Sequence, residues 1–322
     1  MESVENIKKE IKELKEKHNA LIFAHYYQDG EIQDIADELG DSLFLAARGS
    51  EVDAPVVLMA GVVFMAESIK ILSPEKTVLI PSLEAGCSLV DHSPFDKYKK
   101  WREENADAIM VSYVNSSAEV KALTDITCTS TNAVDIISAI PKDRKILFGP
   151  DKNLGAYLAK KTGREMKLWP GSCQVHVLFS AKKLMDLKAE HPDALVIAHP
   201  ECEEQVLAHA DKIGSTSFLL KEVRENPKTK FIVATEEGIF HEMKKQRPEA
   251  TLIQAPARGN CACNECPFMK MNTLAGIRDA LKFMKPEVTV ADDLIERARL
   301  PLERMMKVTK GQVITWPERF EW

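Results

Sequence analysis

An internal repeat of roughly 85 residues restricts the possible folds of this chain more than any other feature of its sequence. The segments NALIFAHYYQ, DAIMVSYVNS and DALVIAHPEC each have the pattern of a buried strand that ends in polar residues. Their alignment brings into one column three residues that are 88 and 86 positions apart, His25, Tyr113 and His199. Two residues further on, a second column contains Tyr27, Asn115 and Glu201. Because both columns recur three times, we interpret the chain as three related units.

The register of the repeat continues beyond these strand ends. Each unit goes on with a predicted helix, at 31–40, 118–125 and 203–214, and then with a turn that carries a hydroxyl group 17 residues after the first column. The hydroxyl residues are Ser42, Ser130 and Thr216, in positions typical of helix N-caps. Two more strands are predicted in each unit, at 54–61 and 76–82, at 144–151 and 166–171, and at 229–236 and 250–256. A cysteine follows the last strand of each unit, namely Cys87, Cys173 and Cys266.

Strands that alternate with amphipathic helices predict an α/β fold with mainly parallel sheets. We expect three homologous three-layer α/β domains around a pseudo-threefold axis. The predicted domains are residues 1–87 together with 269–322, then 88–173, and then 174–268, with the C-terminal segment packed on the N-terminal helix and the first domain. Because ligands of parallel sheets bind at the carboxyl ends of the strands, the polar columns and the cysteines should meet at one central active site.

Composition limits the partners and the location that we expect for the protein. A formal net charge of −6 argues against a nucleic-acid partner. We expect positive charge only locally, at a site for anionic substrates. No apolar segment reaches the roughly 20 residues of a membrane span, so we expect no membrane partner. The N-terminal sequence MESVENIKKEIKELKEKH predicts a charged amphipathic helix and no signal peptide. These features predict a cytoplasmic protein whose seven cysteines stay reduced.

Reduced cysteines serve as metal ligands, as catalytic groups or as small core residues. Cys87 and Cys173 lie in polar, glycine-flanked turns that favour a ligand, whereas Cys128 and Cys202 are predicted to be core residues. One thiolate from each unit would leave one iron of a [4Fe–4S] cluster without a protein ligand. That iron would be open to substrate or water and could act as a Lewis acid.

The C-terminal run CACNECP allows other interpretations of its cysteines. A local zinc site would need a second pair of ligands at close spacing, and none follows in the sequence. The spacing also differs from the CxxxCxxC of radical enzymes that use S-adenosylmethionine. Cys261 and Cys263 remain open between spare thiols, a redox pair and alternate ligands.

Many motifs of this chain resemble those of the quinolinate synthase family. In chain order they are HYYQ, GDSL, FMAES, GCSL, SYVNSSAEVKA, CTSTNAV, GPDKNLG, WPGSCQVH, HPEC, GSTS and CNECPFMKMNTL. The resemblance extends from about residue 20 to residue 275. Two departures are Val63, where many relatives have a polar residue, and the spacing C-x-C-x-x-C in place of C-x-x-C-x-x-C near the end.

The resemblance implies an activity and a cofactor. The family condenses iminoaspartate with dihydroxyacetone phosphate to quinolinate, phosphate and water, a reaction of de novo NAD biosynthesis. It implies a [4Fe–4S] cluster held by Cys87, Cys173 and Cys266, with the remaining iron left for substrate. Cys266 resembles the third ligand of the family because Pro-x-Met follows it. An aspartate-oxidising enzyme would be the transient source of iminoaspartate.

The resemblance also implies roles for individual residues. Those expected to contact substrate are His25, Ser42, Tyr113, Asn115, Ser130, His176, His199, Glu201 and Thr216. The expected catalytic residues are Glu201 as the general base, Tyr27 as a group that orients the triose or transfers a proton, and His25 as a donor to a carboxylate or ketone oxygen. GPDKNLG could position Asp151 or Lys152 or be a plain loop, and it receives no role.

Two other interpretations remain at this stage. A three-domain [4Fe–4S] enzyme of the radical type that acts in diphthamide synthesis would also have one cysteine per domain, but the hydroxyl column, which suits small anions, argues against it. A zinc- or cluster-stabilised binding module would not explain why polar residues recur at three strand ends.

Overall fold

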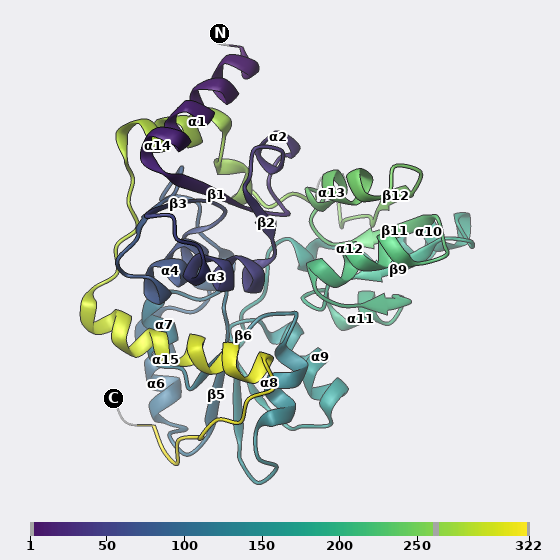
Figure 1. Ribbon diagram of the computed structural model, residues 1–322. Helices are drawn as coiled ribbons and strands as arrows, with labels where there is room; N and C mark the ends of the chain where they lie inside the picture. Colours follow the sequence, from purple (N-terminus) through teal and green to yellow (C-terminus); the bar gives the residue numbers. More distant parts are fainter. Residues whose placement is uncertain (1–2, 260–263, 321–322) are drawn as a thin grey trace.

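The computed structural model describes residues 3–259 and 264–320 of the chain. It contains three parallel four-stranded sheets, which lie at the top, bottom and right of Figure 1. All three have the same strand order, β2-β1-β3-β4, β6-β5-β7-β8 and β10-β9-β11-β12. The prediction of three repeated α/β units is therefore confirmed.

The strands are short and occupy equivalent places in the three units. In the first sheet they are β1 (Ala20–His25), β2 (Glu38–Gly40), β3 (Val56–Ala60) and β4 (Thr77–Leu79). In the second they are β5 (Ile109–Tyr113), β6 (Ile126–Cys128), β7 (Ile146–Gly149) and β8 (Lys167–Leu168). In the third they are β9 (Leu195–Ala198), β10 (Lys212–Ile213), β11 (Lys230–Ala234) and β12 (Thr251–Gln254).

The helices fill the connections between these strands. Those of the first unit and the C-terminal segment are α1 (Val4–His18), α2 (Gly30–Gln33), α3 (Ser42–Glu51), α4 (Val63–Leu72), α14 (Leu274–Phe283) and α15 (Asp292–Thr309). Those of the second unit are α5 (Ser88–Asp91), α6 (Phe95–Glu103), α7 (Ala118–Ala122), α8 (Ala133–Ala139) and α9 (Lys152–Thr162). Those of the third are α10 (Ala181–Glu190), α11 (Glu204–Leu207), α12 (Thr216–Glu225) and α13 (Ile239–Gln246), with the 3₁₀ turns η1 (His176–Leu178) and η2 (Met269–Met271).

Each sheet is the middle of three layers. In the first unit α1 and α14 pack on one face of the sheet, and α3 and α4 pack on the other. The strands β3 (VVLMA) and β5 (IMVSY) are buried along their whole length. A central parallel strand is covered by helices on both faces, which explains why these strands are continuous apolar runs without polar alternation.

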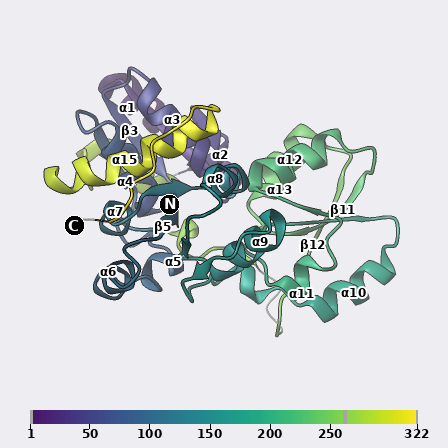
Figure 2. The same cartoon turned by 90° about the horizontal axis from the view of Figure 1, so that it is seen from below.

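The C-terminal segment packs on two units. Helix α14 lies against α1 and β3 of the first unit, as expected for this segment. Helix α15 instead crosses from α4 of the first unit to α7, β6 and α8 of the second (Figure 1, yellow). Figure 2 shows the same helix from below, with the third unit on the opposite side of the molecule. The domain limits derived from the repeat stay a prediction.

The prediction of a helix after the first strand of each unit is partly wrong. The segment 31–40 forms a helix only in α2 and ends in strand β2, and the segment 203–214 forms α11 and then strand β10. In the second unit the helix α7 ends at Ala122, before strand β6 begins. Strands β2 (ELG) and β10 (KI) closely follow helices and lack an apolar run of their own, so the sequence does not distinguish them from the end of a helix.

The structure shows a further repeated position, which the sequence alignment did not use. Asp37, Asp125 and Asp211 each accept a hydrogen bond from a backbone N–H of the first strand of their own unit, at 2.7–2.8 Å. In the second unit the carboxylate is also paired at 2.7 Å with Arg102, which is fully buried. These aspartates lie at the amino ends of the sheets, away from the strand ends that carry the polar columns, and we assign them to fold stability.

We expect Asp125→Ala to destabilise the fold more than Asp37→Ala. The first change leaves the guanidinium of Arg102 buried without its carboxylate and should lower the free energy of unfolding by about 3–5 kcal/mol. The second removes a partly exposed partner of Lys15 and one acceptor, with an expected loss of about 1–2 kcal/mol. Urea denaturation followed by circular dichroism measures both. Equal losses would contradict this assignment.

Candidate active site

The carboxyl ends of all three sheets border one cavity. Every residue that the sequence predicted for the site lies on its wall, namely His25, Tyr27, Ser42, Cys87, Tyr113, Asn115, Ser130, Cys173, His176, His199, Glu201, Thr216 and Cys266. Residues separated by more than 200 positions in the chain thus face the same space. The structure brings this set together, and their chemical roles follow from the contacts that each of them makes.

The hydroxyl column does not cap helices in the way that we expected. Asp41 is the N-cap of α3 and accepts from the N–H of Phe44, and Ser215 is the N-cap of α12. Ser42 and Thr216 are the first helical residues, one position later. Because a neighbour caps the helix, the hydroxyl groups of Ser42 and Thr216 remain available to the cavity that they line.

His25 and His199 are equivalent in their hydrogen bonding as well as in their position. The Nδ1 atom of His25 accepts from the N–H of Tyr27 at 3.1 Å, and Nδ1 of His199 accepts from the N–H of Glu201 at 3.4 Å. An accepting Nδ1 leaves the proton of a neutral imidazole on Nε2. Burial lowers the pKa of His25 to about 4 and that of His199 to about 3. Both rings are therefore neutral near pH 7 and present an Nε2–H donor.

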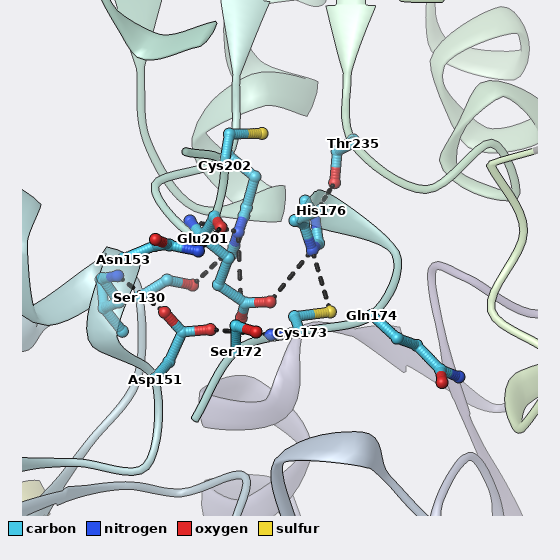
Figure 3. Close-up of polar contacts among 12 residues, drawn as sticks. Ser130, Asp151, Asn153, Ser172, Cys173, Gln174, His176, Glu201, Cys202 and Thr235 are labelled. Atoms are coloured by element: carbon cyan, nitrogen blue, oxygen red, sulfur yellow. Dashed lines mark hydrogen bonds and ion pairs between the residues drawn. The ribbon is translucent and has the colours of Figure 1, made fainter. Parts of the chain in front are cut away.

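Glu201 is the central carboxylate of the cavity. Its Oε2 lies 3.0 Å from Nδ1 of His176 (Figure 3). Tyr113 also donates a hydrogen bond to the carboxylate. Burial would raise the pKa of Glu201, but the neighbouring His176 and these hydrogen bonds outweigh burial and hold the pKa below its usual value. Glu201 is thus an ionised, buried carboxylate with its donors arranged around it.

Tyr27 connects the first unit to the third. Its hydroxyl group lies 3.0 Å from Oγ1 of Thr216 and 2.7 Å from Oγ1 of Thr235. Thr235 also contacts Nε2 of His176 at 3.0 Å (Figure 3), so the hydrogen bonds continue from Tyr27 through Thr235 and His176 to Glu201. Sequence analysis missed Thr235, because it belongs to no column and its partners lie far away in the chain.

Asn115 contributes a polar atom that has no protein partner. Its Oδ1 is buried, and it makes no hydrogen bond to the residues that the structure describes. A buried amide oxygen without a donor is costly, and a polar ligand in the cavity would satisfy it. This geometry fits the expectation that Asn115 contacts substrate.

The three repeated cysteines are free thiols on the cavity wall. Each precedes a short helical turn, whose backbone N–H groups point at the sulfur: those of Leu89 and Val90 at Cys87, and that of His176 at Cys173. Burial raises the pKa of Cys87 to about 12 and that of Cys266 to about 11. The three thiols line the same cavity, and in addition to burial Cys266 raises the pKa of Cys87, and Cys87 raises that of Cys173. Hydrogen bonds from N–H groups to sulfur are a usual feature of thiolates that bind iron–sulfur clusters.

The other cysteines separate into two groups. Cys128 and Cys202 are fully buried in hydrophobic clusters, as predicted for core residues. Cys261 and Cys263 lie outside the described residues.

One group of side chains has the geometry of a metal site. The ligand atoms of Cys173, His176 and Glu201 all lie within 4.8 Å of one another, and Sγ of Cys173 is 3.2 Å from Nδ1 of His176 (Figure 3). Sulfur and imidazole ligands suit iron and zinc. The cavity therefore holds a candidate metal-binding group, and the thiols of Cys87 and Cys266 line the same space.

The charge of the cavity differs from our expectation. Its lining includes Asp41, Glu201 and Glu236 but no lysine or arginine among the described residues. The prediction of a locally positive site is therefore wrong. The donors that face the cavity are hydroxyl groups, imidazole N–H groups and amides, and burial keeps the rings of His25 and His199 neutral near pH 7.

Asp41 is a site residue that the sequence did not reveal. Its Oδ2 accepts from Oγ1 of Thr131 in the second unit at 2.8 Å and from Oγ of Ser217 in the third at 2.6 Å. Together with the cap on α3, these contacts tie the three units together beside the cavity. A signal existed in the column after the hydroxyl residues, where Thr131 and Ser217 are equivalent, but it did not indicate a shared partner.

Among the described residues, no helix has both the length and the apolar character to cross a membrane.

Comparisons with known proteins agree with this geometry. The sequence profile of the family described as "Quinolinate synthetase A protein" matches residues 9–307. A protein of Chloroherpeton thalassium with the name "Quinolinate synthase" is 53% identical over 302 residues, which are 94% of this chain and 94% of the relative. Proteins of the same name from Prochlorococcus marinus and Microcystis aeruginosa are each 51% identical, over 94% and 93% of this chain and 91% and 94% of their own lengths. With a family match over most of its length, this chain belongs to the quinolinate synthetase A family.

Proposed function

We propose that this protein condenses iminoaspartate with dihydroxyacetone phosphate to form quinolinate in NAD biosynthesis, at a site that holds a [4Fe–4S] cluster. The observation that carries this proposal is the convergence of three equivalent cysteines and three equivalent polar columns on one cavity. Membership of the family and the shared name of its relatives support the reaction. Its balance requires the release of phosphate and two molecules of water for each quinolinate.

Binding of the substrates rests on neutral donors. Iminoaspartate carries two carboxylates, and the hydroxyl groups of Ser42, Ser130 and Thr216 line the cavity at or close to helix starts. Helix starts supply free N–H groups and a favourable dipole for anions. The Nδ1 atom of His25 accepts a hydrogen bond from the N–H of Tyr27, whereas its Nε2–H can donate to a carboxylate or ketone oxygen.

Proton transfer is assigned to Glu201. Formation of the pyridine ring requires repeated removal of protons from carbon, and Glu201 is a buried, ionised carboxylate that can accept them, although His176 and Tyr113 lower its pKa. His176 and Tyr113 hold the carboxylate in place. Tyr27 and Thr235 extend this hydrogen-bonded chain to Thr216, so a proton taken up at Glu201 has a path through hydroxyl groups across the cavity.

The donor set fits an iron–sulfur cluster. Cys87, Cys173 and Cys266 offer three thiols, with backbone N–H groups already aimed at their sulfur atoms. When bound, a cluster with three protein ligands offers an open iron, which can polarise a leaving hydroxyl group as a Lewis acid. A cytoplasmic location, where thiols stay reduced, and supply of iminoaspartate by an aspartate-oxidising enzyme belong to the same proposal.

The test of the function is an anaerobic assay of the reconstituted protein. Iminoaspartate is generated in the mixture from aspartate by an oxidising enzyme, dihydroxyacetone phosphate is added, and quinolinate and phosphate are quantified. We expect equal amounts of both products, and none when the triose phosphate is omitted. A protein that carries four irons and forms no quinolinate would defeat the proposal.

Replacement of a proposed ligand should abolish retention of the cluster. For Cys87→Ser, Cys173→Ser or Cys266→Ser we expect loss of the brown colour and of bound iron after anaerobic reconstitution, because each thiolate is one of only three protein ligands. Cys128→Ala is the matched control, since Cys128 is buried in a hydrophobic cluster and should keep the full iron content. Equal iron binding in ligand and control variants would refute the ligand set.

Loss of the base should affect the rate more than the binding. We expect Glu201→Gln to lower kcat by about 10²–10⁴-fold, because an amide cannot accept the proton. Iron content should stay near that of the parent protein. Glu204→Gln, an exposed glutamate on α11 that pairs with Lys160, serves as the control and should leave kcat unchanged. A Glu201→Gln variant with more than a third of the parent kcat would rule out Glu201 as the base.

A further inference from the structure

Two buried carboxylates that sequence analysis left without a role each hold the backbone of a proposed cluster ligand. The N–H of Cys173 donates to Oδ2 of Asp151 at 3.2 Å (Figure 3), and the N–H of Cys266 donates to Oε1 of Glu236 at 3.1 Å. Both carboxylates are completely buried. Neither is the proposed base, and Asp151 does not line the cavity.

The two carboxylates occupy the same position of the repeat. In the second sheet Ser112 of β5 pairs with Gly149 of β7, and in the third sheet Ala198 of β9 pairs with Ala234 of β11. Asp151 lies two residues after Gly149, and Glu236 lies two residues after Ala234. The sequence alignment had not compared these positions, and the strand register makes them equivalent.

The second oxygen of each carboxylate is fixed at the end of its own strand. Oδ1 of Asp151 accepts from the N–H of Leu154 at 2.8 Å and thereby caps α9. Oε2 of Glu236 accepts from the N–H of Gly238 at 2.7 Å. Each side chain therefore connects a rigid strand end to a cysteine loop through its two oxygens.

The first unit achieves the same connection without a carboxylate. The equivalent residue is Val62, since Ala24 of β1 pairs with Ala60 of β3. Here the N–H of Val63 donates directly to the backbone oxygen of Ala85 at 2.8 Å, next to the loop of Cys87. In all three units a hydrogen bond thus ties the end of the third strand to the chain segment at the cysteine.

Electrostatics alone would disfavour these carboxylates. Burial and the neighbouring Glu201 raise the pKa of Asp151 well above its usual value. Burial raises the pKa of Glu236 to about 7, against the opposite effect of Lys270 at 3.6 Å from its Oε1. Asp151 and Glu236 each accept at least two backbone N–H groups, which would otherwise be buried without an acceptor. The two side chains therefore fix the positions of backbone groups and do not compensate a charge on the cysteines.

We propose that Asp151 and Glu236 are positioning residues that hold Cys173 and Cys266 in the arrangement that retains the [4Fe–4S] cluster. The inference rests on the proposed function only in that it takes these cysteines as ligands of the cluster. Outer partners of metal ligands typically change metal affinity by about 10–100-fold when they are removed.

The experiment compares Asp151→Asn and Glu236→Gln with the parent protein after anaerobic reconstitution. Two backbone N–H groups each need an acceptor oxygen, and an amide offers one oxygen in place of two. The hydrogen bond to the cysteine or the one to the strand end is therefore lost. The readout is the rate at which the absorption near 400 nm disappears in the presence of an iron chelator. We expect this rate to rise about 10-fold or more in each variant, and the electron paramagnetic resonance lines of the reduced cluster to change.

Asp211→Asn is the matched control. Asp211 also accepts a backbone N–H at 2.8 Å, from Val196 in the third unit, but at the opposite end of the sheet. It should lower the melting temperature without faster loss of the cluster. If the amide variants fail to fold, Asp151→Glu and Glu236→Asp replace them. These variants keep the carboxyl group but move it by one methylene group, and the same result is expected.

Equal rates of cluster loss in the parent and in folded variants would overturn the inference, and so would an equal acceleration in Asp211→Asn. A parent protein that binds no iron at all would instead refute the proposed cofactor, so the two failures are distinguishable.

Discussion

Parallel pairing of the strands is the constraint on which the rest of this structure depends. All neighbouring strands in the three sheets run in the same direction, so each sheet places its carboxyl ends along one edge. The three edges surround one cavity, and the place of a residue in the repeat therefore determines its place in the site. Cysteines follow the fourth strands, the column of His25, Tyr113 and His199 lies at the ends of the first strands, and the hydroxyl column lies at or close to helix starts. One short pattern used three times thus surrounds the cavity.

The same scaffold produces an asymmetric site because equivalent positions carry different side chains. In the second column a phenol, an amide and a carboxylate stand at Tyr27, Asn115 and Glu201. Of the three only Glu201 is a carboxylate, the proposed base, and its donors His176 and Tyr113 come from outside its own strand and, for Tyr113, from another unit. The amide oxygen of Asn115 has no hydrogen-bond partner in the part of the chain that the structure describes. A threefold frame thus supports a reaction that needs one base and distinct binding positions.

The sequence predicted the units, the long strands and the wall of the cavity, because burial and the repeat leave a pattern along the chain. It did not predict strands β2, β6 and β10, which closely follow helices and have no long apolar run of their own. It also missed Thr235 and Asp41, whose importance comes from partners more than 50 residues away in the chain. The capping of α3 by Asp41 in place of Ser42 shows a limit of another kind, since neighbouring polar residues compete for one cap and only the backbone geometry decides between them.

In the proposed reaction, anionic substrates bind in a cavity whose described lining contains no lysine or arginine, which has a physical advantage for this chemistry. Despite burial, His176, His199 and Tyr113 already hold the pKa of Glu201 below its usual value. A further cation beside the carboxylate would lower this pKa more and weaken the base. The pKa of His25 is lowered to about 4 by burial, so this ring donates a hydrogen bond without a charge. Thr216 opens α12, whose ten residues add a dipole that favours negative charge at its start. Substrate carboxylates can then lie close to an ionised glutamate because each is held by its own set of oriented neutral dipoles, which are stronger in a buried site than in water.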